Sequence, residues 1–164
     1  MTNRNLVFVD TETTGLDPDN DKLVELSWAV NDGPIKTLYF GVEEVPSFID
    51  KLIGFTKRGI AGKRSTDREI SEFIDESVDQ TVVAANRYFD QRYLENNGLW
   101  FAHYRAIEMG SYAMGRLGLD YIPGMKDIER EVEARGIKIP VAADHTSAND
   151  VNAMRYMFNV LKYL

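Results

Sequence analysis

The 164-residue sequence contains no cysteine, which excludes disulfide bonds, thiolate metal ligands and a cysteine nucleophile. It has no apolar run near the ~20 residues that cross a bilayer. The first ten residues, MTNRNLVFVD, hold only four consecutive apolar residues before an acid, too few for the hydrophobic region of a signal peptide. These absences predict a cytoplasmic protein with no membrane partner.

A surplus of basic residues is also missing, because 26 acidic and 19 basic residues give a formal net charge of −7. This balance argues against a protein that coats nucleic acid without regard to sequence, since such binding depends on positive charge. It does not argue against a nuclease. An enzyme that collects carboxylates to hold divalent cations carries acid as part of its chemistry, and the cations reverse the local field.

What remains is the composition of an ordinary globular protein, with 44% hydrophobic and 27% charged residues. No internal repeat, low-complexity tract or linker divides the chain. We therefore predict a single domain over residues 1–164, long enough to bury a core.

The apolar pattern predicts an α/β fold whose mixed five-stranded sheet is flanked by helices. Three N-terminal strands form an antiparallel meander, and alternating helices and strands follow it. The strand at 22–31 alternates as if one face were buried, and the basic, glycine-containing stretch 56–65 is predicted to be a loop. The expected strands are 5–10, 22–31, 35–41, 81–85 and 99–102, and the expected helices are 46–53, 66–79, 89–97, a helix ending at 117, 126–135 and 148–162.

Two carboxylates follow the first predicted strand in LVFVDTETTG. Positions two apart on a strand point to the same side, so Asp10 and Glu12 project together. Two carboxylates on one side are the minimum needed to hold a hard cation through oxygen. The alternative is that these acids only blunt the end of a strand at the surface.

Two later stretches add to this pair of acids. In VVAANRYFDQRYL a buried strand leads into a helix, and Asp90 falls in the first turn, where the helix macrodipole by itself favours an acid. In ADHTSANDV, His145 and Asp150 are five residues apart and cannot share one helical face. If His145 lies in the loop before the helix and Asp150 one turn inside it, both side chains can face one point.

The segments DTETTG, NRYFD and HTSAND resemble the three motifs of the 3′–5′ exonucleases that have an Asp-Glu-Asp-Asp core and a histidine. This family includes the proofreading subunit of the bacterial replicative polymerase, ribonuclease T and oligoribonuclease. The resemblance implies a ribonuclease H-like fold. It also implies a complete catalytic set of Asp10, Glu12, Asp90, His145 and Asp150.

Hydrolysis of a phosphodiester requires a nucleophile made from water and stabilisation of charge on the attacking and leaving oxygens, which two divalent ions provide. The carboxylates of Asp10, Glu12, Asp90 and Asp150 would offset much of the charge of two Mg²⁺ or Mn²⁺ ions, which prefer hard oxygen ligands. His145, with a reference pKa near ~6.5, can take a proton from the attacking water. The resemblance implies the same role for it.

A narrower resemblance, to oligoribonuclease, lies in TGLDPDND and FDQRYLENNGLWFAHYRAIEMGSY. It implies that Leu16 wedges against terminal bases and that Tyr104 of a dimer partner caps the 5′ phosphate of a very short RNA. Ordinary packing is the alternative for both. Thr13, Asn86 and Phe89, which lie within the first two motifs, complete the expected substrate-binding set.

The chain departs from the oligoribonuclease pattern at several places. It has RAIEMGS where Asp-Val-Ser is expected, HTSANDV where Ala normally stands two residues after the histidine, and a shorter segment before HYR. These departures leave the dinucleotide specificity open without affecting the catalytic set.

One basic cluster stands out in this acidic chain. It consists of Lys57, Arg58, Lys63, Arg64 and Arg68. The cluster either contacts phosphates beside the active site or forms a solvated loop.

His103 has no acidic neighbour in sequence and is expected to be structural.

The sequence therefore predicts a two-metal 3′–5′ exonuclease that removes nucleoside monophosphates from the 3′ end of single-stranded DNA or RNA. One alternative is an oligoribonuclease-like enzyme restricted to very short RNA. Another is a catalytically silent binding or regulatory protein on the same fold, although such a protein usually loses an acid or the histidine, and all five are present. A homodimer or a polymerase partner remains open.

Overall fold

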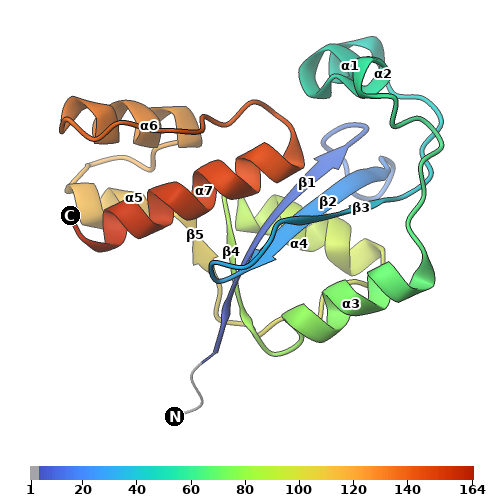
Figure 1. Cartoon of the computed structure of the whole chain (residues 1–164), viewed down its shortest axis with the longest axis horizontal. Helices are drawn as coiled ribbons and strands as arrows, with labels where there is room; N and C mark the ends of the chain where they lie inside the picture. Colours follow the sequence, from blue (N-terminus) through green and yellow to red (C-terminus); the bar gives the residue numbers. More distant parts are fainter. Residues whose placement is uncertain (1–3) are drawn as a thin grey trace.

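Five strands form one mixed sheet in the order β3-β2-β1-β4-β5 in the computed structural model, which describes residues 4–164 (Figure 1). β1 and β2, and β2 and β3, are antiparallel, whereas β1 and β4, and β4 and β5, are parallel. The predicted fold class is confirmed. The strands are β1 (Leu6–Thr13), β2 (Leu23–Val30), β3 (Lys36–Tyr39), β4 (Thr81–Ala84) and β5 (Ile107–Glu108).

Helices cover both faces of this sheet (Figure 1). The apolar side chains of α3 and α4 pack on one face, those of α5, α6 and α7 pack on the other, and α1 and α2 close a smaller cluster near the start of β2. The helices are α1 (Ser47–Ile53), α2 (Phe55–Arg58), α3 (Asp67–Ser77), α4 (Arg87–Asn96), α5 (Met109–Leu117), α6 (Met125–Ala134) and α7 (Ser147–Lys162).

The expectation that β2 buries only one face is wrong. Seven of its eight residues are buried, because helices lie against both sides of the strand. On one face Trp28 meets Phe73 of α3 edge to face, with ring centroids 5.2 Å apart. On the other face Ala29 packs in the cluster formed with α7. Any polar side chain on β2 must therefore find a partner inside the protein.

Two local predictions are also corrected. Residues 99–102 are not a strand, because the backbone groups of Phe101 and His103 form hydrogen bonds with the turn before β4 and not with a neighbouring strand. The fifth strand of the sheet is β5 instead. The first residues of the predicted loop 56–65 belong to a short helix, α2. A glycine in the left-handed conformation flanks this helix at each end, Gly54 at φ 66° and Gly59 at φ 61°.

The remaining predicted elements are confirmed to within a few residues. The capping box at the start of α3 is present, with the Thr66 side chain accepting from the N–H of Glu69 and the Glu69 carboxylate accepting from the N–H of Thr66. Within residues 4–164, every helix is too short or too polar to cross a membrane.

Candidate active site

The strand β1 carries both acids of the first motif. β1 extends three residues beyond the predicted 5–10 and ends at Thr13, so Glu12 lies within the strand rather than past its end and Asp10 is not the last residue of the strand. They share a face with Phe8, which packs in the cluster of α7. β4 pairs with β1 only over residues 6–8, so the second half of β1 is left without a neighbour on that side.

The first turn of α7 brings a third carboxylate to the same place. One oxygen from each of Asp10, Glu12 and Asp150 lies within 4.8 Å of the others. Asp150 Oδ1 also accepts hydrogen bonds from the backbone N–H groups of Asp144, at 2.9 Å, and His145, at 3.2 Å. These bonds fold the loop before α7 back onto the helix start, so the loop and Asp150 are held as one unit.

The fourth carboxylate, Asp90, is buried beside this group but is not part of it. It lies in the first turn of α4, as predicted, and Asn86 caps that turn. Its Oδ1 accepts from both the backbone N–H of Thr11, at 3.1 Å, and the Thr11 hydroxyl, at 2.7 Å. Thr11 was not predicted, and it fixes Asp90 against β1 between the two acids of the first motif.

His145 lies in the loop before α7, as its spacing from Asp150 predicted, and its side chain is exposed. Its φ of +63° is in the left-handed region, which non-glycine residues seldom adopt and which often marks functional positions. Its imidazole donates or accepts no hydrogen bond with any residue in 4–164. His145 also lies close enough to Asp150 to lower the pKa of that carboxyl, which burial raises overall.

Burial raises the pKa of every carboxyl in the group, and repulsion between the acids adds to this at Asp10 and Glu12. Burial, followed by repulsion from Asp90 and Glu12, raises the pKa of Asp10 well above its usual value. Burial raises the pKa of Glu12 to about 9, with repulsion from Asp150 and Glu25 adding to it. Burial raises the pKa of Asp90 to about 7, against the two bonds from Thr11. Such a group holds protons or a cation.

The donor set fits a hard divalent cation. Three carboxylate oxygens within 4.8 Å of one another can share an ion of the size of Mg²⁺ or Mn²⁺, and their ionised forms need compensating charge. Asp90 lies close enough to repel Asp10 and Glu12 but is not among the three grouped acids.

A buried ion pair beneath these acids escaped the sequence analysis. Glu25 stands directly opposite Glu12 in the register of β1 and β2, and none of its surface is exposed. Arg58 Nη2 donates to both of its oxygens, at 2.9 and 2.7 Å. Ser147, the first residue of α7, donates to Glu25 Oε1 through its N–H at 3.2 Å and its hydroxyl at 2.6 Å. The Ser147 hydroxyl also bonds that of Ser27, at 2.6 Å.

Neither alternative for the basic cluster, phosphate contact or a solvated loop, holds for Arg58, because its side chain is partly buried against Glu25. The signal in the sequence was an acid inside the apolar strand LVELSWAV, which demands a cationic partner once both faces are covered. Lys63 lies over the ring of Tyr39, 4.1 Å from its centroid. Arg64 and Arg68 are exposed.

The expected substrate-binding residues fall into two groups. Leu16 is 84% exposed and Tyr104 is 70% exposed, so neither is a core residue and the packing alternative is wrong for both. Thr13 is buried, and its hydroxyl donates to the Gly15 carbonyl at 2.6 Å. Asn86 is an N-cap, and Phe89 packs against Tyr93 with ring centroids 4.9 Å apart. These three residues shape the backbone of the two motifs.

His103, predicted to be structural, makes local contacts. Its Nδ1 accepts from the backbone N–H of Arg105 at 3.2 Å, and its ring lies 4.3 Å from that of Tyr104.

Comparisons with known proteins agree with the motifs. No family model matches the chain. It is 33% identical over 103 residues to a PolC-type DNA polymerase III of Thermotoga petrophila, which covers 60% of the chain but only 7% of that polymerase. It is 26% identical over 149 residues to the oligoribonuclease of Pseudomonas putida, across 76% of the chain and 81% of that protein.

The fold matches solved structures of exonuclease I. The complex of the E. coli enzyme with single-stranded DNA aligns over 99% of the chain and 41% of its own, with a TM-score of 0.68 and 18% identity. Exonuclease I of Methylocaldum szegediense aligns with a TM-score of 0.69, over 98% of the chain and 41% of its own, also at 18% identity. The chain thus spans less than half of these structures.

The chain has the fold of exonuclease I, and this fold brings acids of the first and third motifs together. The resemblance to the 3′–5′ exonuclease family that the three motifs indicated is confirmed by relatives named oligoribonuclease and PolC-type polymerase and by the fold shared with exonuclease I.

Proposed function

We propose that residues 1–164 form one exonuclease domain that hydrolyses single-stranded DNA or RNA from the 3′ end, releasing nucleoside monophosphates. The observation that carries this proposal is the grouping of Asp10, Glu12 and Asp150 within 4.8 Å, with Asp90 fixed beside them, on the fold of exonuclease I. One strand, β1, and two helices, α4 and α7, supply these acids from distant parts of the sequence. A merely acidic surface would not bury them together.

In this proposal the four carboxylates hold two Mg²⁺ or Mn²⁺ ions, which when bound supply an activated water and stabilise the developing charge. Glu12 and Asp10 bind from β1, Asp150 binds from α7, and Asp90 binds from α4. His145, exposed at the rim with a free imidazole, accepts the proton of the attacking water. Its backbone is in the left-handed region, and it lies close enough to Asp150 to lower the pKa of that carboxyl, which burial raises overall.

The exposed apolar residues are the proposed contacts for the strand. Leu16, in the loop after β1, and Tyr104, in the loop before β5, offer apolar and aromatic surface on which bases can stack. Single-stranded 3′ ends are the proposed partners. A restriction to very short RNA is the second candidate, favoured by the exposure of Tyr104, which in a homodimer could cap a 5′ phosphate of a strand bound to the other copy.

The decisive experiment incubates the purified protein with 5′-labelled single-stranded DNA and RNA in Mg²⁺, Mn²⁺ or EDTA. We expect stepwise shortening from the 3′ end only with metal, and a loss of at least about a thousandfold in rate for Asp10→Ala, because the ions lose a ligand. Asp120→Ala, which removes an exposed acid outside the site, is the matched control. Absence of metal-dependent hydrolysis at every strand length would leave the catalytically silent alternative.

A length series tests the second candidate. If Tyr104 caps a 5′ phosphate, Tyr104→Ala should slow hydrolysis of dinucleotides by about tenfold or more while leaving strands of ten nucleotides little changed. Tyr121→Ala, at another exposed tyrosine, serves as the control. Equal slowing at all lengths contradicts the capping role, and rates should then be compared for DNA and RNA to define the substrate.

A further inference from the structure

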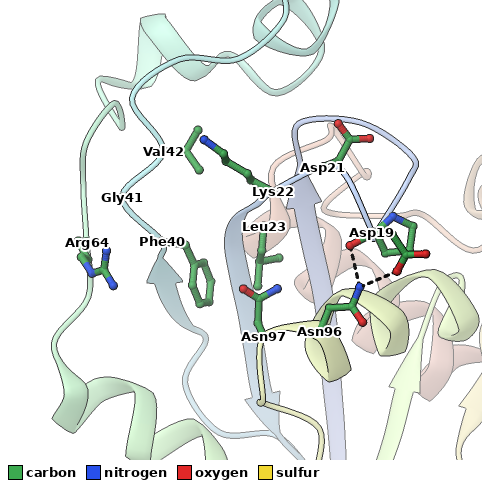
Figure 2. A pocket seen from close by; sticks show the side chains of 11 residues that line it. Asp19, Asp21, Lys22, Leu23, Phe40, Gly41, Val42, Arg64, Asn96 and Asn97 are labelled. Carbon is green, nitrogen blue, oxygen red and sulfur yellow. Dashed lines mark hydrogen bonds between the residues drawn. The ribbon is translucent and has the colours of Figure 1, made fainter.

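A pocket of about 620 Å³ opens at the same end of the sheet as the carboxylates, but none of the five catalytic residues lines it. Its volume is typical of sites for small ligands. Figure 2 shows it between the start of β2, the segment that follows β3 and the end of α4. The residues used below are Lys22, Leu23, Phe40, Val42, Arg64 and Asn97.

The acids that line this pocket are already engaged. Asp19 accepts from Arg92 and from Asn96, each at 3.2 Å, on the side of α4 (Figure 2). Asp21 accepts from the hydroxyl of Thr14 at 3.2 Å and from the N–H of Asp17 at 2.9 Å. The Asp19 carboxylate is thus paired with α4, and the Asp21 carboxylate is held by hydrogen bonds within the loop between β1 and β2.

The cations of the pocket, in contrast, are not neutralised. The side chains of Lys22 and Arg64 make no ion pair and no hydrogen bond with any residue of the described chain, 4–164. They stand on two walls of the pocket, Lys22 at the start of β2 and Arg64 on the segment that pairs with Phe40 (Figure 2). Among the described residues, Lys22 and Arg64 thus line the pocket without a pairing acid, in a protein whose net charge is −7.

The lining of the pocket is mainly polar, and Phe40 supplies its accessible apolar surface. Phe40 is partly buried, whereas Leu23 and Val42 are buried and contribute almost no exposed surface. Asn97 lines the same pocket from the end of α4 (Figure 2); its amide nitrogen donates to the Tyr93 carbonyl at 2.7 Å, so its Oδ1 is left to accept a hydrogen bond. The pocket thus combines two cations, one aromatic ring and one acceptor.

We propose that this pocket binds a nucleotide, with its phosphate between Lys22 and Arg64, its base against the ring of Phe40, and Asn97 accepting from a base amino group. The inference deepens the proposed function and rests on it for the choice of ligand. The loop that carries the exposed Leu16 runs from the carboxylates to the pocket, so a strand with its 3′ end at Asp10 has a path to it. The nucleotide is either a unit of that strand or a free nucleoside monophosphate.

Calorimetric titration with AMP in EDTA tests the site, because EDTA prevents metal-dependent binding at the carboxylates. We expect wild-type protein to bind AMP, and Lys22→Ala and Arg64→Ala to weaken binding by about tenfold each, since each removes a charge-assisted contact. Lys126→Ala, an exposed lysine on α6, should bind as the wild type does. Because all three side chains are exposed, thermal unfolding should show that each variant is folded.

Three results would overturn the proposal: no AMP binding in EDTA, binding that neither Lys22→Ala nor Arg64→Ala weakens, or inorganic phosphate binding as tightly as AMP, which would remove the base from the site. The source of the nucleotide follows from kinetics. If it is a unit of the strand, Arg64→Ala raises KM for long strands but not for dinucleotides. If it is a free product, Arg64→Ala leaves KM unchanged at every strand length and weakens the inhibition of hydrolysis by AMP.

The same titration separates this inference from the proposed function. Glu12→Ala should abolish hydrolysis yet retain AMP binding in EDTA, since Glu12 does not line the pocket. Hydrolysis without AMP binding would overturn the pocket alone. AMP binding that depends on Arg64, in a protein that hydrolyses nothing, would overturn the exonuclease proposal alone.

Discussion

Two single residues shape the proposed site, one through its backbone and one through its hydrogen bonds. His145 adopts a left-handed backbone although it is not glycine, and its imidazole is exposed with no partner among the residues described. Thr11, between two acids of β1, donates both its N–H and its hydroxyl to Asp90. The backbone of His145 costs conformational energy, whereas the two bonds from Thr11 hold a buried acid in place.

The role of His145 can be tested without disturbing its backbone. Asparagine tolerates the left-handed region, so His145→Asn should keep the loop while removing the proton acceptor. We expect the single-turnover rate to fall by about a hundredfold or more, with the affinity for Mn²⁺ unchanged. His103→Asn is the matched control. A variant that loses Mn²⁺ affinity in proportion to rate would show His145 to be a positioning residue instead.

At the scale of elements, the start of α7 is anchored to the sheet by a buried network. Ser147 donates twice to Glu25, and Glu25 is held by Arg58 of α2, so two helices meet on one carboxylate of β2. Since Glu25 faces Glu12 across the strands, this network also fixes the distance between Asp150 on α7 and the acids of β1. The ion pair thus contributes both to the stability of the fold and to the geometry of the site.

Breaking this pair should be severe. Arg58→Met leaves the fully buried Glu25 without its cation and should lower the free energy of unfolding by about 3–5 kcal/mol, measured by urea denaturation. The double variant Arg58→Met with Glu25→Gln should recover part of the loss, because no buried charge remains. Lys57→Met, at the exposed neighbouring position, is the control. A loss below about 1 kcal/mol for Arg58→Met would mean that water replaces the arginine.

At the scale of the whole molecule, the sheet and its two helical layers hold acids together that would separate in an unfolded chain. Their raised pKa values mean that, without metal, the folded protein binds more protons than the unfolded chain over the range between the ordinary carboxyl pKa of ~4 and about 9, the value for Glu12. The stability that this protonation contributes is complete below pH ~4 and is lost as pH rises through the folded-state pKa values.

We therefore expect the free energy of unfolding in EDTA to be lower at pH 8.5 than at pH 5.5, by about 2 kcal/mol or more. Glu12→Gln should flatten this dependence, whereas Glu44→Gln, at an exposed position, should not. Adding Mn²⁺ should raise Tm more at pH 8.5 than at pH 5.5, because ionised carboxylates bind it. Stability that is flat or rises with pH in EDTA would contradict the crowding of these carboxyls.

Much of this arrangement is local and could be predicted from the sequence. Apolar alternation and the capping box at Thr66 gave the order of strands and helices, because such patterns act over a few residues. Three short motifs named Asp10, Glu12, Asp90, His145 and Asp150, and spacing alone put His145 in a loop and Asp150 inside the helix. The error at 99–102 arose where a distant turn took the backbone bonds of an apolar segment.

The sequence by itself determined which elements form and which acids the site uses, since both depend on neighbours along the chain. Only the tertiary structure decided that Thr11 holds Asp90, that Arg58 neutralises Glu25 beneath Glu12, and that Lys22 and Arg64 face one pocket. The residues in each of these contacts are 33 to 79 positions apart (42 from Lys22 to Arg64). Their meeting is set by strand register and helix packing, which no local pattern records.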